Sequence, residues 1–216
     1  MVARNREALL DIKLHQNDLP DGLDLGPMIA VDTETLGLSL VRDRLCLVQL
    51  SAGDGTAHLV QWPAGGEDSY DAPNLKALLS DPKRLKLFHF GRFDLAVLRR
   101  DLGVVAAPVY CTKIASKLVR TFTDRHGLKD LCRDLLGVEL SKQQQTSDWG
   151  AANLSAQQLE YAASDVLYLH DLKTKLDAML ERQSRTEFAA KCFEFLPTRA
   201  DLDLAGWGEV DIFAHS

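Results

Sequence analysis

The chain has 216 residues, of which 46% are hydrophobic and 26% charged, a composition typical of an ordinary soluble domain. Its formal net charge of −6 argues against a protein that holds long nucleic acid by neutralising many phosphates. No apolar run approaches the roughly 18–20 residues that span a bilayer, and no signal peptide is visible, so we expect no membrane and a cytoplasmic location. The four scattered cysteines contain no Cys-x-x-Cys pair, which favours reduced thiols over a zinc site or disulfides.

Hydrophobic patterning predicts alternating strands and helices along the chain. A loop rich in Pro, Gly and Asp over 15–27 leads into the first strand. The turn at 52–55 is so short that the strands on either side of it are expected to form an antiparallel hairpin. In chain order we expect strands at 28–32, 45–50 and 56–62, a helix N-capped by Asn74, a strand at 85–90, a helix at 93–102, a strand near 109–110, and helices at 112–119 and 128–136.

The clearest element is a long helix that begins after Ser155. Ser155 and Gln158 form a capping box, and apolar residues follow at helical spacing as far as Leu176. The stretch 195–216 shows no period and is expected to be an extended tail. This order of elements predicts an α/β fold, a mixed β-sheet flanked by helices.

The first expected strand ends in two acids, Asp32 and Glu34. On an extended backbone, residues i and i+2 point to the same face, so both carboxylates project together. Their mutual repulsion is unfavourable unless a proton or a cation lies between them. A solvated strand end is the ordinary alternative, and this motif alone does not decide between the two.

Two further acids lie in separate segments. Asp94 falls in the first turn of the helix after the strand at 85–90, where an acid also suits the helix dipole. Tyr161 and Asp165 are four residues apart in the long helix, so the phenol and the carboxylate share one face. A buried Tyr–Asp hydrogen bond is the ordinary alternative for that pair.

The four carboxylates together indicate a metal site. Mg²⁺ and Mn²⁺ take oxygen ligands, and two such ions about 3.5–4 Å apart clamp the attacking and leaving oxygens of a phosphodiester. Carboxylates from three separated segments match that requirement. The sequence therefore predicts a site for two divalent cations.

These motifs resemble those of a known superfamily. The order Asp32-x-Glu34, Asp94, Tyr161-x-x-x-Asp165 resembles the three exonuclease motifs of the DEDD superfamily, tyrosine subclass. Residues 142–149 and 159–166 resemble ribonuclease D, and the likeness covers roughly residues 28–180. More narrowly, segments at 32–38, 89–94 and 211–216 resemble the nano-RNase C family. The resemblance implies a ribonuclease H-like single exonuclease domain at 28–180, after a lead-in at 1–27 and before an extension at 181–216 that packs on the domain or a neighbouring subunit.

The resemblance also implies catalytic roles. Asp32, Glu34, Asp94 and Asp165 would bind two Mg²⁺ or Mn²⁺ ions per active site, one activating a water and the other stabilising the departing 3′ oxygen. Tyr161 would orient that water, because a phenol with an ordinary pKa of about 10 is a poor general base at neutral pH. The products would be nucleoside 5′-monophosphates.

By the same resemblance, the candidate substrate-binding residues are Thr35, Leu36, His89, Phe90, Lys142 and Gln145. Leu36 would separate the last two bases, and its backbone, with that of Thr35, would meet the terminal 3′-hydroxyl. Phe90 would stack on a base, and His89 would touch a phosphate. Each has an ordinary alternative: a core leucine, a buried strand phenylalanine, a satisfied core histidine, and a solvated loop for Lys142 and Gln145.

The nano-RNase C family is associated with very short oligonucleotides, dinucleotides especially, and with ring-shaped homo-octamers. We therefore expect short RNA, with short DNA as a further option, as substrate and a homo-oligomer as the assembly. The negative net charge and the 36 residues after position 180, too few for an accessory helical domain, favour short substrates. Trimming of longer RNA or single-stranded DNA, as in ribonuclease D, remains an alternative, as does a non-catalytic nucleic-acid-binding or scaffold module on the same fold.

Overall fold

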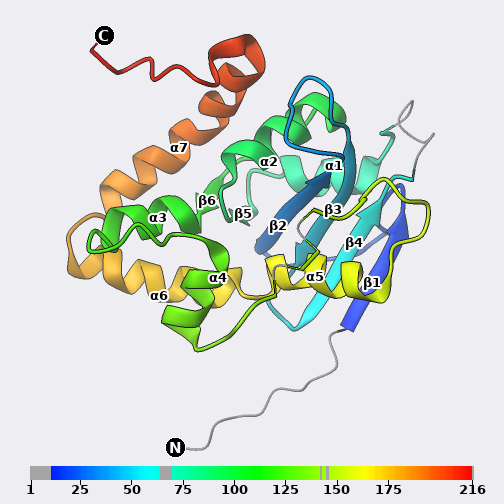
Figure 1. Cartoon of the computed structure of the whole chain (residues 1–216), viewed down its shortest axis with the longest axis horizontal. Coiled ribbons are helices and arrows are strands. Elements are labelled where there is room, and N and C mark those ends of the chain that lie inside the picture. Colours follow the sequence, from blue (N-terminus) through cyan, green and yellow to red (C-terminus); the bar gives the residue numbers. More distant parts are fainter. Residues whose placement is uncertain (1–10, 64–69, 142, 145, 216) are drawn as a thin grey trace, which may run out of the picture.

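The computed structural model describes residues 11–63, 70–141, 143–144 and 146–215, and its centre is a six-stranded sheet in the order β1-β4-β3-β2-β5-β6 (Figure 1). The strands are β1 (Asp11–Gln16), β2 (Met28–Thr35), β3 (Leu45–Ser51), β4 (Thr56–Gln61), β5 (Leu85–Phe88) and β6 (Val109–Cys111). The helices are α1 (Pro73–Ser80), α2 (Arg92–Val97), α3 (Thr112–Val119), α4 (Leu128–Leu131), α5 (Ala156–Leu167), α6 (Leu169–Arg182) and α7 (Thr186–Leu202). π-Helical turns continue three of them at Leu98–Leu102, Cys132–Leu136 and Asp203–Trp207.

The sheet is mixed, as predicted. β3 pairs antiparallel with β4 and with β2, whereas β2, β5 and β6 run parallel. The predicted hairpin turn is confirmed: Gly53 and Gly55 have φ values of 79° and 95°, which glycine adopts without the strain that a side chain would bring. Because β2, β5 and β6 are parallel neighbours, their carboxyl ends meet at one edge of the sheet, where α/β proteins commonly bind ligands.

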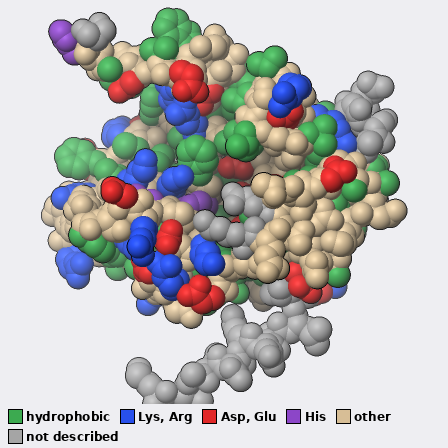
Figure 2. All heavy atoms as spheres, viewed as in Figure 1, with side chains coloured by type: hydrophobic (Ala, Val, Ile, Leu, Met, Phe, Trp, Pro, Cys, Tyr) green, Lys and Arg blue, Asp and Glu red, His purple; other side chains and the backbone are tan. Residues whose placement is uncertain are grey.

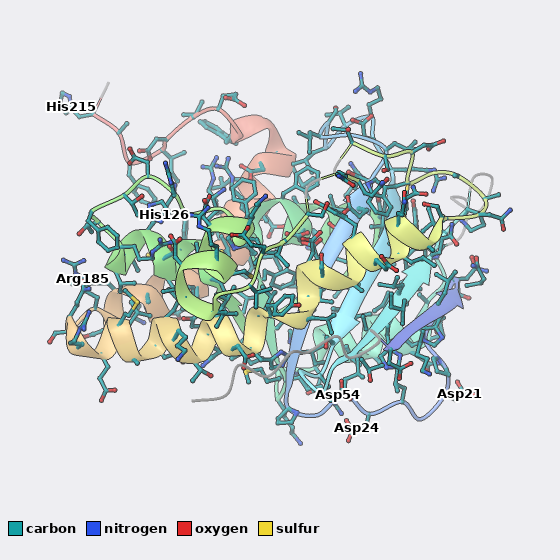
Figure 3. The ribbon with its side chains drawn as sticks, turned by 60° about the horizontal axis from the view of Figure 1, so that its bottom comes forward. Asp21, Asp24, Asp54, His126, Arg185 and His215 are labelled. Carbon is teal, nitrogen blue, oxygen red and sulfur yellow. The ribbon has the colours of Figure 1, made fainter. Side chains whose placement is uncertain are left out.

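Helices cover both faces of this sheet. α5 crosses one face over β2, β3 and β4, as Figures 1 and 3 both show, and α1 lies on the other. α3, α6 and α7 gather beside the β6 edge. The predicted α/β class, with a mixed sheet flanked by helices, is therefore confirmed.

Two predictions for the N-terminal half are wrong. β1 is a sixth strand, parallel to β4, in a region expected to be lead-in and loop. At α1 the helical N-terminus is not capped by Asn74, since Ala72 precedes the helix and Pro73 opens it. The carboxylate of Asp18, from a distant loop, accepts the backbone N–H groups of Asn74 and Leu75, each at 2.9 Å. The cap is thus a tertiary contact that local pattern cannot show.

Two predictions for the C-terminal half are also wrong. The long helix expected from Ser155 to Leu176 is divided at Tyr168, whose φ of −105° and ψ of −2° end α5 and begin α6. The first part of the stretch expected to be an aperiodic tail, residues 195–202, belongs to α7, which ends at Leu202. The buried residues of α7 lie on both sides of position 195, and the segment from 195 onward contains too few of them to show the helical period. They are Ala189, Phe193, Leu196 and Ala200.

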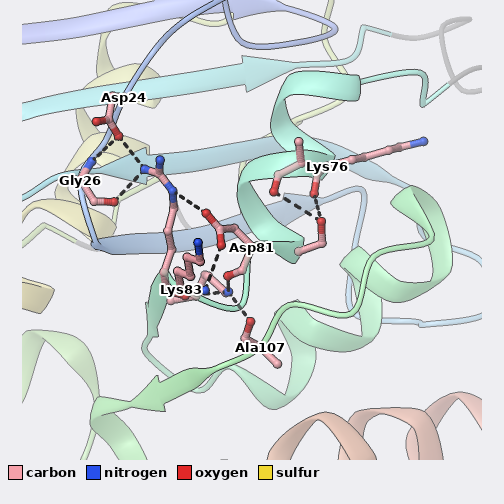
Figure 4. Close-up of polar contacts among 10 residues, drawn as sticks. Asp24, Gly26, Lys76, Asp81, Lys83 and Ala107 are labelled. Atoms are coloured by element: carbon pink, nitrogen blue, oxygen red, sulfur yellow. Dashed lines mark hydrogen bonds and ion pairs between the residues drawn. The ribbon is translucent and has the colours of Figure 1, made fainter.

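A buried lysine ties β5 to its surroundings. The Lys86 side chain is fully buried, and its Nζ donates to the carbonyls of Asp81 at 2.8 Å and Arg84 at 2.7 Å and to that of Ala107 (Figure 4). Burial lowers the pKa of Lys86 to about 8. The Arg84 guanidinium pairs with Asp24 and Asp81 beside this network.

The C-terminal segment leaves the body of the molecule after α7. Figure 3 shows His215 standing away from the helices, and Trp207, Ile212 and Phe213 expose large parts of their apolar side chains. Among the described residues, no helix has the length and apolar character needed to cross a bilayer.

Candidate metal and substrate site

Three of the predicted acids converge between β2 and α5. Asp32 and Glu34 project from the same face of β2, and Asp165 reaches them from α5. Each offers a carboxylate oxygen, and these oxygens all lie within 4.8 Å of one another. The predicted convergence of strand and helix is thus found.

The sequence of α5 explains this close approach. The predicted capping box at its start is present: Gln158 N donates to Ser155 Oγ at 3.2 Å, and Ser155 N donates to Gln158 Oε1 at 3.0 Å. Ala162 and Ala163 are fully buried, and such small side chains let the helix axis come near the sheet. Asp165 is thereby held against the carboxylates of β2.

Asp94 joins the site from the first turn of α2. Its carboxylate accepts a hydrogen bond of 2.7 Å from Thr33 Oγ1, the residue between the two acids of β2. Asp94 does not belong to the group of three acids, Asp32, Glu34 and Asp165, whose oxygens lie within 4.8 Å of one another. Its charge nevertheless raises the pKa of each member of that group, so the four acids form one electrostatic unit.

Burial and mutual repulsion shift all these acids in one direction. Burial is the larger cause and neighbouring carboxylates the next, and together they raise the pKa of Asp32 well above its usual range. The same two causes raise the pKa of Glu34 to about 9 and that of Asp165 to about 7. For Asp94, burial raises the pKa to about 7 against the opposing Thr33 hydrogen bond. Oxygen donors crowded in this way fit a hard divalent cation, which removes the repulsion.

Tyr161 lies one helical turn before Asp165 on the same face of α5. Burial, followed by the charges of Asp165 and the β2 acids, raises its pKa far above the ordinary value, so the phenol keeps its proton. The hydrogen bond that Tyr161 donates to Asp165 lowers the pKa of that carboxyl, and so opposes the increase caused by burial and by Asp94. A protonated phenol can donate a hydrogen bond, which suits an orienting role better than that of a base.

Phe90 follows β5 at the same edge of the sheet. It is 48% exposed and has a φ of 66°, so it is not the buried strand phenylalanine of the alternative reading. A bulky residue with positive φ is rare, and strained positions of this kind cluster at functional sites. Lys113 Nζ lies 4.1 Å from the centre of the ring, a contact the sequence did not suggest.

Leu36 lies just beyond the β2 acids. It is 52% exposed, so it is not an ordinary core leucine. A Cβ at Gly150 would come within 2.6 Å of Leu36 Cδ2, and only glycine there lets the leucine keep this position. Thr35 is buried, and its hydroxyl donates to the Gly37 carbonyl.

His89 is a neutral, hydrogen-bonded histidine. The Thr112 hydroxyl donates to the Phe88 carbonyl and therefore accepts from His89 Nδ1, at 2.9 Å. Burial, and then the charge of Lys113, lower the pKa of His89 to about 3. This arrangement matches the satisfied histidine of the alternative reading better than a cation that neutralises a phosphate.

The remaining two candidates, Lys142 and Gln145, lie outside the described residues. Figure 2 shows basic side chains gathered over α3 and α4. Sequence reasoning missed Thr33, which donates to Asp94, and Lys113, which lies over the Phe90 ring. Only Thr33, placed between Asp32 and Glu34, carried a signal in the sequence.

Comparisons with known proteins agree with this geometry. A model of the 3′-5′ exonuclease family matches residues 9–181. Ribonuclease D of Acidiphilium cryptum is 35% identical over 173 residues, covering 80% of this chain and 43% of the relative. The chain spans less than half the length of the first curated ribonuclease D relatives that it matches.

Solved structures give a fuller match. Brucella melitensis NrnC bound to pGG is 59% identical, with a TM-score of 0.91, and the match covers 96% of this chain and 100% of that one. Brucella melitensis NrnC with bound Mg²⁺ is 58% identical, with a TM-score of 0.89 and coverage of 95% and 100%. With its acids and tyrosine in the DEDD order and its sheet matching that of NrnC, the chain belongs to the 3′-5′ exonuclease family and has the ribonuclease H-like fold.

Proposed function

We propose that the chain is a two-metal-ion 3′-5′ exoribonuclease that releases nucleoside 5′-monophosphates from very short oligonucleotides, dinucleotides especially. The observation that carries the proposal is the group of carboxylate oxygens from Asp32, Glu34 and Asp165 within 4.8 Å of one another, with Asp94 beside them. The similarity to Brucella melitensis NrnC, solved with Mg²⁺ and with pGG, supports both the metal and the substrate class.

The four acids hold two Mg²⁺ or Mn²⁺ ions in this proposal. When bound, the cations supply a water nucleophile at neutral pH and stabilise the charge that develops on the phosphate and the leaving oxygen. The protein's own task is to keep the ligand oxygens fixed. Thr33 does this for Asp94, and the buried Ala162–Ala163 face of α5 does it for Asp165.

Tyr161 orients the attacking water, and Tyr161→Phe tests this role. We expect kcat to fall about 10- to 100-fold, because a small misplacement of the nucleophile is enough for such a loss. Mg²⁺ affinity, measured by calorimetry, is expected to change little, since the phenol is not one of the ligands. A Tyr161→Phe enzyme with unchanged kcat would contradict the role.

Substrate contacts lie along the same edge of the sheet. Leu36 separates the last two bases, and the backbone of Thr35 and Leu36 meets the terminal 3′-hydroxyl. Phe90 offers one face of its ring to a base while Lys113 covers the ring on its other side. Lys142 and Gln145 remain proposed phosphate contacts on the strength of the resemblance alone.

Phe90→Ala is expected to raise the KM for a dinucleotide about tenfold, because stacking contributes about 1–3 kcal/mol per base. Phe122→Ala is the matched control, since Phe122 is also an exposed phenylalanine with a cation near its ring, the guanidinium of Arg120 at 5.8 Å. Steady-state kinetics of both variants decides the point. Equal KM values for Phe90→Ala and Phe122→Ala would remove Phe90 from the binding site.

Substrate length is tested with end-labelled RNA and DNA ladders from two nucleotides upward, digested with Mg²⁺ and with Mn²⁺. We expect the two-nucleotide RNA to disappear fastest. Equal or faster cutting of long chains would support trimming of longer RNA, as in the ribonuclease D relatives. No cutting of any length would support a non-catalytic module.

We also propose that the protein acts in the cytoplasm as a homo-oligomer, a ring octamer by the family resemblance. The exposed apolar side chains of Trp207, Ile212 and Phe213 support self-association. Light scattering that shows a monomer at micromolar concentration would contradict the oligomer.

A further inference from the structure

Gln49, in the middle of β3, is a buried polar side chain without a partner. The residue is fully buried, and neither Nε2 nor Oε1 has a hydrogen-bond partner within the part of the chain that the structure describes. Removing an amide from water without replacing its hydrogen bonds is unfavourable, and most buried polar groups avoid it. An apolar side chain of similar shape would be more favourable at this position. Packing alone therefore does not explain why a glutamine is found there.

The position of Gln49 in the sheet suggests a role at the metal site. Gln49 is directly opposite Asp32 across the β2–β3 ladder, and opposite residues in an antiparallel pair share a face with their Cβ atoms about 4.5–5.5 Å apart. Asp32 faces α5, because its carboxylate oxygen lies with that of Asp165. The Gln49 side chain therefore lies beside the candidate metal ligands, under the helix that carries Asp165.

The other neighbours at this position are apolar. Across β4 the opposite residue is Leu59, and two residues earlier on the same face is Leu47; both belong to an apolar cluster with Trp149 and Ala162. Two residues later, Ser51 already donates its hydroxyl to the Thr56 carbonyl at 2.7 Å. On the sheet surface around Gln49, Asp32 is the acceptor directly opposite the amide.

A second buried glutamine shows what a structural role looks like. Gln61, on β4, is as buried as Gln49, but its Oε1 accepts from Gln16 and its Nε2 donates to the Ala151 carbonyl, each at 3.0 Å. Both ends of that amide hold chain segments together. Gln49 makes no such link among the described residues.

We propose that Gln49 is a positioning residue for the metal site: in the metal-loaded enzyme its amide N–H donates to the carboxylate of Asp32 and fixes the direction of the ligand oxygen. Asp32 is then ionised and a strong acceptor, and the amide gains the partner that it lacks otherwise. Hydrogen bonds that orient a metal-binding carboxylate commonly change metal affinity about 10- to 100-fold when removed. The inference rests on the proposed function, since it needs a cation at Asp32.

Gln49→Met, with Gln61→Met as the matched control, tests the proposal. For Gln49→Met we expect a higher Tm of the metal-free protein, because an unpaired buried amide is replaced by an apolar chain of similar length. We expect Mg²⁺ affinity by calorimetry to fall about 10- to 100-fold, with the Mg²⁺ concentration for half-maximal cleavage rising in step and saturating Mg²⁺ restoring turnover. Gln61→Met should show the reverse: a lower Tm and unchanged Mg²⁺ affinity.

The outcomes separate this inference from the proposed function. If the wild type binds Mg²⁺ and Gln49→Met binds it equally well, Gln49 has no positioning role, whatever the activity. If Gln49→Met and Gln49→Leu both fail to fold, the proposal is also overturned, because it requires apolar replacements to be tolerated. If the wild type itself binds no Mg²⁺ or Mn²⁺, the proposed function fails.

Discussion

Asp165→Asn is expected to lower kcat by about a thousandfold or more and, at the same time, to raise the Tm of the metal-free protein. Turnover falls because Asp165 supplies an oxygen to the cluster of carboxylates that we propose as the cation site. Metal-ion catalysis contributes several kcal/mol, and about 1.4 kcal/mol corresponds to each factor of ten in rate. Stability rises because asparagine removes one of the negative charges that repel one another at this site.

Single-turnover cleavage and thermal melts measure the two effects on the same preparations. Asp177→Asn, on α6, is the matched control: Asp177 is an exposed partner of Lys173, and such surface pairs contribute about 0–1 kcal/mol. It should leave kcat unchanged and shift Tm little. Near-normal turnover of Asp165→Asn in Mg²⁺ would show that the acids have been assigned wrongly.

The metal-free protein is expected to lose stability as the pH rises from about 6 to 9. The pKa values of Asp94 and Asp165 are raised to about 7 and that of Glu34 to about 9, whereas the unfolded chain has ordinary carboxyl pKa values of about 4. Between these limits the folded state binds more protons than the unfolded state. The stabilisation is therefore complete below the unfolded pKa and is lost as the pH rises through 7 to 9.

The size of this effect follows from linkage. Each proton held only by the folded state changes the free energy of unfolding by about 1.4 kcal/mol per pH unit, and 1 kcal/mol shifts Tm by about 2–4 °C for a chain of this size. We expect a fall of at least about 5 °C across this range in EDTA. Saturating Mg²⁺ should make Tm less dependent on pH and should raise Tm at pH 8, because a bound cation neutralises the carboxylates in place of the protons.

Melts in EDTA and in Mg²⁺ at several pH values check this prediction, and Asp165→Asn is the control that should show a shallower fall in EDTA. A metal-free Tm that is constant or rises between pH 6 and 9 would contradict the electrostatic account of the site. Identical profiles with and without Mg²⁺ would favour the scaffold alternative.

Local pattern was enough to predict most of the fold. The alternation and apolar runs of the central strands, the hairpin turn with Gly53 and Gly55, and the Ser155 capping box all correspond to structure. The two wrong predictions in the N-terminal half have tertiary causes. Asp18 caps α1 from a distant loop, and β1 is stabilised by pairing with β4 rather than by its own composition.

In the candidate site, too, some residues could be predicted from local pattern and others could not. Asp32, Glu34 and Asp165 were predictable because strand and helix periods place them on defined faces, and the structure brings them together. Lys113 over Phe90 and Gln49 beside Asp32 depend on pairings between segments far apart in the chain. No spacing rule within one segment contains that information.

The central claim is that these acids hold cations that hydrolyse a phosphodiester bond at the 3′ end of a very short oligonucleotide. Its most direct test is to incubate pGG with the wild type and with Asp165→Asn, each in Mg²⁺ and in EDTA, and to identify the products by chromatography. We predict guanosine 5′-monophosphate from the wild type in Mg²⁺ alone, with intact pGG in the other three reactions. Cleavage in EDTA, a 3′-monophosphate product, or intact pGG in all four reactions would contradict the claim.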